Sequence, residues 1–173
     1  MNVMQEVRIE KITINIGIGE AGDKLTKATI LLGKLTNAKP IQTITMKRIP
    51  SWGLRPKLPI GAKVTLRGKK AEEMLSRFFK ALDNKINMKK FDSNGNLAFG
   101  IKEYLDIPGV EYDPGIGIIG LEVAVTLERP GYRIKKRKLN KSKIGIKHLL
   151  TKEDAKNFII KNFGVKVIEG EEE

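Results

Sequence analysis

The chain lacks cysteine and has one histidine and few aromatic residues. Without cysteine it can form no disulfide, thiolate zinc site or cysteine nucleophile, a composition that fits a reducing compartment. His148 alone cannot build a histidine metal cluster, and no serine lies in a nucleophile elbow. We therefore predict a protein that is not an enzyme and that holds no cofactor and no metal.

Long apolar runs are also missing. No stretch approaches the roughly 20 residues needed to cross a bilayer, and the amino terminus lacks the charged-then-apolar order of a signal peptide. We expect a cytoplasmic protein without a membrane partner. A length of 173 residues suits one domain, so we predict a single domain over residues 1–173.

Negative charge is absent from a long part of the chain. Between Lys24 and Ala71 there is no acidic residue, whereas lysine and arginine occur twelve times. The net charge is +13 even though a short acidic tail, residues 169–173, supplies four of the twenty acids. Such a charge opposes compaction and favours a polyanionic partner, most simply nucleic acid, with an anionic membrane surface as the weaker alternative.

A long basic loop, residues 47–61, is predicted between two alternating segments, IQTIT and AKVTLR. Alternation is typical of strands with one buried face. Three prolines limit the loop's conformations, which argues against disorder. Its tryptophan has two equally open interpretations: it stacks on RNA, or it anchors the loop as a buried side chain. The candidate RNA-binding residues of the loop are Lys47, Arg48, Trp52, Arg55 and Lys57.

Two predicted strands each carry a polar face. In the first strand, residues 7–17, isoleucines alternate with polar residues, and the second strand ends in KVTLR. The polar positions of both strands would share one exposed sheet face that is cationic and rich in hydrogen-bonding groups. With a lysine that precedes the long loop, the candidate RNA-binding residues here are Lys11, Thr13, Asn15, Lys39, Lys63, Thr65 and Arg67.

The remaining periodicity predicts three helices and two further strands. Helices are expected from Asp23 to Asn37, from about Lys70 to Met88, and from a Thr151 cap to Gly164. Strands are expected at about Leu97–Ile101 and Leu121–Leu127, and the glycine-rich residues between them are expected to form an exposed excursion. We predict an α+β fold with a largely antiparallel sheet, helices on one face, and the other face open.

A basic segment follows the last predicted strand. Residues 129–147 contain nine lysines and arginines and no acid, together with several apolar residues. The composition allows a disordered tail, but the apolar residues favour a segment that orders on RNA. Its candidate RNA-binding residues are Arg133, Lys135, Lys136, Arg137 and Lys138.

A glycine pattern offers an alternative function. Gly17, Gly19 and Gly22 satisfy the G-x-G-x-x-G spacing, which would suit a small nucleotide-dependent enzyme. However, Glu20 lies where a pyrophosphate would bind, and no acid follows about 20 residues later to hold a ribose. We favour a plain strand-to-helix turn.

Several stretches, in their order and spacing, together resemble one family. The first group reads IEKITINIGIGEA, KPIQTITMKR, LPIGAKVTLRG, FDSNGNLAFGIKE and IPGVEYD, and it is similar to the large-subunit ribosomal protein L five family. The part from RPGYRIKKRK to KIGIKHLLTKEDA resembles the archaeal and eukaryotic branch of that family. The resemblance covers nearly the whole chain.

The resemblance implies a curved antiparallel sheet backed by helices and a structural constituent of the large ribosomal subunit. Members of this family bind 5S ribosomal RNA through the open sheet face, on which Asn15 and Thr65 would lie, and touch the large-subunit ribosomal RNA in the central protuberance. By the same resemblance, the long basic loop would contact peptidyl-site transfer RNA. The chain would also bridge to small-subunit protein S thirteen, be ribosome-associated in the cytoplasm, and bind no small-molecule substrate.

Overall fold

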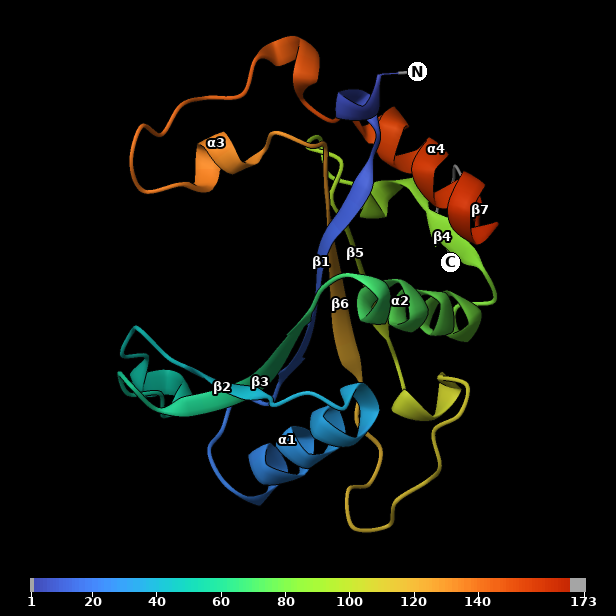
Figure 1. Ribbon diagram of the computed structural model, residues 1–173. Coiled ribbons are helices and arrows are strands. Elements are labelled where there is room, and N and C mark those ends of the chain that lie inside the picture. Colours follow the sequence, from blue (N-terminus) through green and yellow to red (C-terminus); the bar gives the residue numbers. More distant parts are fainter. Residues whose placement is uncertain (1, 169–173) are drawn as a thin grey trace. The chain divides into compact units, whose positions relative to one another are not determined.

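The structure, a computed structural model, describes residues 2–168, so the predicted acidic tail lies outside the described residues. Its main sheet has the strand order β2-β3-β1-β6-β5 and is mostly antiparallel (Figure 1). In chain order the strands are β1 (Arg8–Gly17), β2 (Ile41–Ile44), β3 (Pro59–Leu66), β5 (Leu97–Ile101) and β6 (Leu121–Glu128). A second, parallel pair joins β4 (Lys85–Asn87) to β7 (Lys166–Ile168).

Helices account for most of the remaining regular structure. The α-helices are α1 (Asp23–Thr36), α2 (Lys69–Ala81), α3 (Arg133–Lys136) and α4 (Lys152–Phe163). Short 3-10 turns lie at Val3–Gln5, Pro50–Trp52, Met88–Lys90, Tyr104–Asp106 and Ile146–His148. The predicted α+β class is confirmed. Within residues 2–168, no helix has both the length and the apolar character that crossing a membrane requires.

The chain divides into two compact units. The first unit consists of Met1–Ile12, Arg67–Phe99 and Ala124–Glu173, and the second consists of Thr13–Leu66 and Gly100–Val123. Strands β1, β5 and β6 contribute residues to both units.

In the first unit, α2 and α4 lie on one side of the sheet and the segment carrying α3 lies on the other (Figure 1). The buried stripe of α2 includes Phe78 and Phe79, which recur at helical spacing with Ala71, Met74 and Leu75. The Phe79 ring lies 5.8 Å from that of Phe99 on β5 and meets Phe163 of α4 edge-on at 5.2 Å. These rings join both helices to the sheet.

The predicted end of α2 at Met88 is wrong. The helix ends at Ala81, and Asp83 and Asn84 then take left-handed φ values of 52° and 54°. Aspartate and asparagine tolerate this conformation better than most residues. Ile86, which continues the helical spacing in the sequence, is instead buried in β4 opposite Val167 of β7.

The predicted ends of α4 are confirmed. The Thr151 hydroxyl accepts from the Asp154 backbone N–H at 3.2 Å, and the Asp154 carboxylate accepts from the Thr151 N–H at 3.1 Å. This reciprocal pair is a capping box. Gly164 ends the helix in the left-handed conformation, with φ of 65°.

In the second unit, α1 packs on β3 and buries an aliphatic stripe that includes Leu25, Ala28 and Leu32. Its cap is Gly22, and no side chain caps it; Asp23, the predicted cap, is the first helical residue. The segment between β5 and β6 is not simply an exposed excursion, because Tyr104, Ile107 and Ile116 are all buried. Those apolar side chains fold the glycine-rich segment back onto the unit.

Candidate nucleic-acid interface

The outward face of the sheet in the second unit carries the predicted hydrogen-bonding residues. Alternation buries Val64 and leaves Lys63 and Thr65 exposed on β3, as the sequence predicts. Asn15 on β1 is half-buried rather than exposed, because β1 is a central strand with neighbours on both sides. Its side-chain amide donates to the Glu122 carboxylate on β6 at 3.2 Å, so this amide is already partly engaged. Thr13, two residues earlier, is likewise half-buried.

In the first unit the sheet carries two carboxylates that were not predicted from the sequence to be functional. The side chains of Glu10 on β1 and Glu128 on β6 are only 9% and 12% exposed. Lys136 of α3 donates to both carboxylates at 2.8 Å. Arg67 lies 3.4 Å from Glu10, and Arg8 lies 2.8 Å from Glu128. We name these five residues the carboxylate clip.

The electrostatics of the clip favour the charged forms. Burial raises the pKa of the Glu10 carboxyl, but the hydrogen bond and charge of Lys136, with help from Lys11 and Arg67, hold it below its ordinary value of 4.5. Burial likewise lowers the pKa of Lys136, but hydrogen bonds to Glu10 and Glu128 raise it above the ordinary 10.5. Two of the predicted RNA-binding cations, Arg67 and Lys136, therefore already have carboxylate partners.

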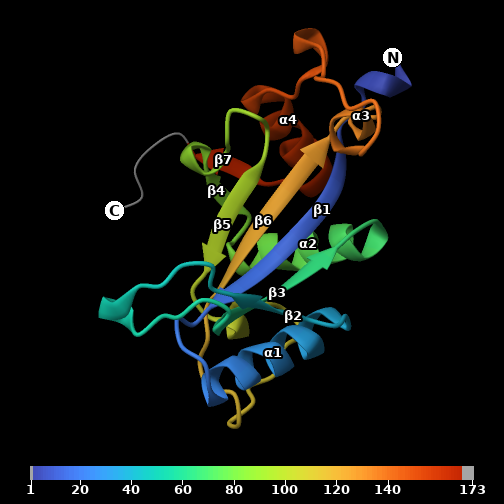
Figure 2. The same ribbon diagram turned by 90° about the vertical axis from the view of Figure 1, so that its left-hand side faces the viewer.

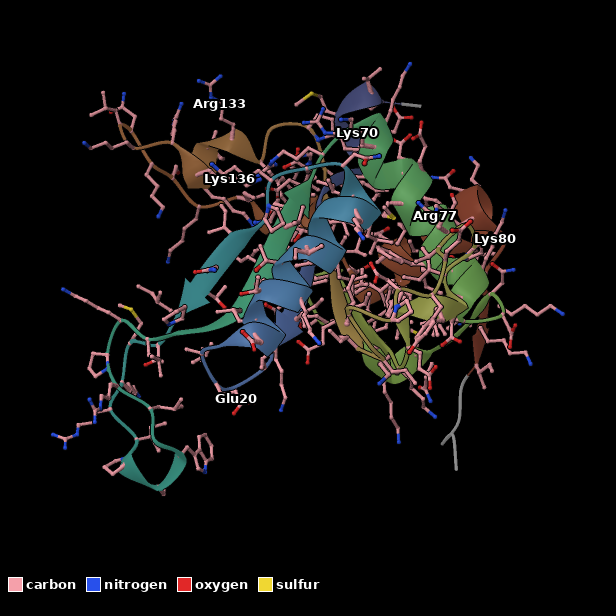
Figure 3. All side chains as sticks on the ribbon, turned by 90° about the horizontal axis from the view of Figure 1, so that it is seen from below. Glu20, Lys70, Arg77, Lys80, Arg133 and Lys136 are labelled. Carbon is pink, nitrogen blue, oxygen red and sulfur yellow. The ribbon has the colours of Figure 1, made fainter. Side chains whose placement is uncertain are left out.

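The other predicted cations of the basic segment are exposed. The Lys135 ammonium lies 5.0 Å from the centre of the Tyr132 ring, and the Arg137 Nε donates to the Asn140 carbonyl at 2.8 Å. Arg133 extends away from α3 toward solvent (Figure 3). Within residues 2–168, Arg133, Lys135, Arg137 and Lys138 have no carboxylate partner.

The basic segment is folded at its base. The Tyr132 hydroxyl accepts from the Leu150 N–H at 2.8 Å and lies 3.2 Å from the His148 carbonyl oxygen. Arg129 binds the Leu149 carbonyl at 3.2 Å and the Asp154 carboxylate at 2.9 Å. These contacts join the start of the segment to its end. The sequence predicted a segment that orders on RNA, and these contacts at its start and end form without RNA.

The long basic loop is ordered by contacts of its own and extends from β2 and β3 (Figure 2). The buried Thr45 hydroxyl lies 3.0 Å from the Lys47 carbonyl oxygen and 2.9 Å from that of Arg55. Ile49 and Leu54 exchange backbone hydrogen bonds of 3.1 and 3.0 Å.

The exposure of Trp52 excludes one of its two interpretations. Trp52 is 73% exposed, and Leu54, only 8% exposed, is the apolar anchor of the loop. The buried-anchor interpretation of Trp52 is therefore wrong. Lys47, Arg48, Arg55 and Lys57 are exposed, as is Lys39 before the loop, and within the described part of the chain none pairs with a carboxylate.

The glycine turn between β1 and α1 carries an ion pair of its own. Glu20 and Lys24 form an ion pair of 2.8 Å at the start of the helix, and this pair lowers the pKa of Glu20. Gly19 and Gly22 have φ of 82° and 142°, which suits the tight turn. A carboxylate there would repel a phosphate. Within residues 2–168, no three His, Asp or Glu side chains gather to hold a metal ion.

The helical layer of the first unit carries further cations that were not predicted from the sequence. Lys70, Arg77 and Lys80 follow one another along α2 (Figure 3). The apolar stripe of this helix marks its buried face, so the complementary face was readable from the same periodicity. The clip was not readable, because Glu10 and Lys136 are 126 positions apart in the sequence.

Comparison with known proteins identifies the family. The family model described as Ribosomal protein L5 matches residues 2–55, and a second model, for the C-terminus of the same ribosomal family, matches residues 59–158. The chain belongs to the ribosomal protein L5 family. The predicted resemblance is thereby confirmed. A ribosomal protein works where ribosomes are, so L5 membership also supports the predicted cytoplasmic, ribosome-associated location.

Similar L5 proteins come from archaea, as the predicted branch implies. The large ribosomal subunit protein uL5 of Sulfurisphaera tokodaii is 48% identical over 171 residues, covering 98% of this chain and 97% of that protein. The proteins of the same name from Nanoarchaeum equitans and Methanosphaera stadtmanae are 49% and 47% identical, over 95% and 96% of this chain and 98% and 99% of their own lengths. These proteins are named as ribosomal constituents, so the prediction of a non-enzymatic protein is confirmed.

Proposed function

We propose that this L5 chain binds 5S ribosomal RNA with the outward face of its sheet and its basic segment, and helps attach that RNA to the large-subunit ribosomal RNA. One observation supports the proposal: each of these elements, together with the residues just before β2, carries exposed cations without carboxylate partners among residues 2–168. They are Lys39, Lys63, Arg133, Lys135, Arg137 and Lys138. We propose that residues 1–173 act as a single RNA-binding domain.

The proposed mechanism is electrostatic and shape-based. Exposed lysines and arginines neutralise phosphates and release counterions, while Thr65 and the half-buried Asn15 and Thr13 offer hydrogen bonds to riboses and unpaired bases. Lys11 would add a cation on the same strand as Thr13. In this mechanism Arg67 and Lys136 mainly pair with the clip carboxylates instead of neutralising phosphates.

Binding of purified chain to 5S ribosomal RNA, compared with an unrelated folded RNA of equal length, tests the proposal. About six phosphate contacts give an expected log-log salt slope of roughly −4 to −5. Replacing Lys135, Arg137 and Lys138 by Gln should flatten that slope by about 2 to 3. A Thr65→Ala variant should fold normally and lose about 1 to 3 kcal/mol of 5S binding. Equal affinity for both RNAs would refute specific 5S binding.

We further propose that the long basic loop contacts peptidyl-site transfer RNA and that the chain bridges to small-subunit protein S thirteen. Four exposed cations and an exposed tryptophan in a self-ordered loop support the first contact, because aromatic faces stack on bases and riboses without sequence preference. The proposed bridge to protein S thirteen rests on family resemblance. If truncating the long basic loop removed that contact, the bridge would lie in the loop.

A further inference from the structure

The two acids of the carboxylate clip share one lysine. Lys136 Nζ binds Oε2 of Glu10 and Oε2 of Glu128, each at 2.8 Å. The opposite oxygens face arginines: Oε1 of Glu10 lies 3.4 Å from Arg67, and Oε1 of Glu128 lies 2.8 Å from Arg8. Every carboxylate oxygen of the pair therefore has a cationic partner.

If Lys136 moved to a phosphate, Glu10 and Glu128 would lose its ammonium as a partner, at a cost in free energy. Glu10 and Glu128 are nearly buried, and a buried carboxylate that loses its partner keeps its desolvation penalty. Arg8 and Arg67 are each about 60% exposed, so they do not replace a partly buried ammonium that touches both acids. Lys136 is therefore held on the sheet.

Lys136 also controls the middle of the basic segment. It ends α3, whose last turn is closed by the Arg137 N–H to the Arg133 carbonyl at 2.9 Å. A second contact, the Ser142 N–H to the Ile134 carbonyl at 3.2 Å, folds the following residues back. The base of the segment is stapled separately through Tyr132. The clip thus joins the middle of the segment to β1 and β6.

We propose that Glu10 and Glu128 are positioning residues for RNA binding: through Lys136 they hold the basic segment folded on the sheet before RNA arrives. The proposal rests on the proposed RNA-binding function. Its consequence is that two acids increase the affinity for a polyanion. A segment that is already folded loses less conformational entropy on binding, and its exposed cations keep a fixed spacing.

Two variants separate this proposal from simple electrostatics. The double variant Glu10→Gln with Glu128→Gln removes two negative charges, so charge alone predicts tighter RNA binding. We expect instead about tenfold weaker binding to 5S ribosomal RNA and at least tenfold faster hydrogen exchange at the Arg137 and Ser142 amides. The Leu150 amide should stay protected, because Tyr132 holds it independently. Glu122→Gln, on the same face of β6, is the matched control and should not change exchange in the segment.

A lysine pair completes the test. Lys136→Met and Lys138→Met each remove one positive charge, but only Lys136→Met should accelerate exchange in the segment without RNA. Unchanged exchange together with tighter RNA binding in the double Gln variant would overturn the proposal. If the parent bound no RNA, the proposed function would fail, whereas the exchange results without RNA would still report whether the clip holds the segment.

A different observation concerns a hollow of about 520 Å³ within the basic segment. Its lining residues are Lys135, Lys141, Ser142, Lys143, Ile144 and Leu149. The wall is mainly apolar, three lysines contribute to it, and none of its lining residues is acidic. The volume lies in the range of sites that hold small molecules.

The geometry points to a site for one unpaired RNA base, with its flanking phosphates on the lysines. Phosphate alone gains nothing from Ile144 and Leu149, whereas a base presents a flat, weakly hydrated face to them. This inference also rests on the proposed RNA-binding function, but it needs no particular RNA for its test.

Methyl-group NMR with small probes tests the base site. Adenosine monophosphate at millimolar concentration should shift the methyl signals of Ile144 and Leu149. Ile146 lies in the same segment, 88% exposed and outside the hollow, and should not shift. Ribose 5-phosphate carries the charge without the base and should produce less than half the shift. Equal shifts with ribose 5-phosphate, or shifts only with a hexaglutamate peptide, would overturn a base site in favour of a general anion site or a protein partner.

Discussion

Neutralising the long basic loop should loosen transfer RNA without harming the fold. The variant replaces Lys47, Arg48, Arg55 and Lys57 by Gln, and all four side chains are exposed. Exposed positions of this kind usually change stability by less than about 0.5 kcal/mol. The loop keeps its own order, because that order comes from Thr45 and from the Ile49–Leu54 pair of backbone hydrogen bonds.

The expected size of the effect follows from counterion release. If each cation contacts one phosphate, the four together contribute about 3 to the log-log salt slope. A fourfold rise in salt should then weaken transfer RNA binding to parent ribosomes about 60-fold more than to variant ribosomes. Filter binding of peptidyl-site transfer RNA to ribosomes carrying either chain measures this difference.

A matched variant controls for total charge. Lys69, Lys70, Lys80 and Lys85 are exposed and lie in the first unit, outside the loop. Replacing these four by Gln should leave the salt slope for transfer RNA unchanged. If the loop variant instead loses 5S ribosomal RNA and keeps normal transfer RNA binding, the loop has been assigned the wrong partner.

Two further outcomes test the loop anchor and the clip. Leu54→Ala should lower the free energy of unfolding in urea, or the free energy of loop opening from hydrogen exchange, by about 2 kcal/mol. Trp52→Ala should leave stability unchanged and weaken transfer RNA binding. Equal losses of stability in the two variants would contradict the assignment of Leu54 as the anchor. The clip should depend on pH at both ends. The lowered pKa of Glu10 means that its stabilisation is complete above about pH 4.5 and is lost as the pH falls through the lowered value. The raised pKa of Lys136 means that its contribution is complete below about pH 10.5 and is lost as the pH rises through the raised value. Amide hydrogen-exchange rates in the basic segment, corrected for the intrinsic pH dependence of exchange, should therefore stay constant between these two pH values. A change in the corrected rate near neutral pH would count against the clip.

Local patterns in the sequence predicted the parts of the fold that depend on neighbouring residues. The alternation in β6, the Thr151 capping box and the Gly164 stop all act within a few residues, so they were readable in advance. The helix from Lys69 ended early because Ile86 gains burial against β7, and no local pattern in the sequence shows that pairing.

The sequence predicted which residues of the candidate site are cationic, but not which contacts they make in the fold. A basic stretch without acids marks the cations, and the exposure of Thr65 follows from strand alternation. Alternation could not show that the Asn15 amide donates a hydrogen bond to Glu122. Nor could it show that Lys136 pairs with one acid on β1 and another on β6. These contacts form only when distant segments pack together, and they decide which cations are available to RNA.

Directed cleavage from a single cysteine tests the central claim most directly, because the chain has no cysteine of its own. Thr65→Cys places an iron chelate on the outward face of β3, and Thr26→Cys places the same probe on an exposed position of α1 in the same unit. If 5S ribosomal RNA binds the outward sheet face, the probe at position 65 should cut it at discrete nucleotides and the probe at position 26 should not. Cleavage from position 26 alone, or equal cleavage from both, would contradict the account.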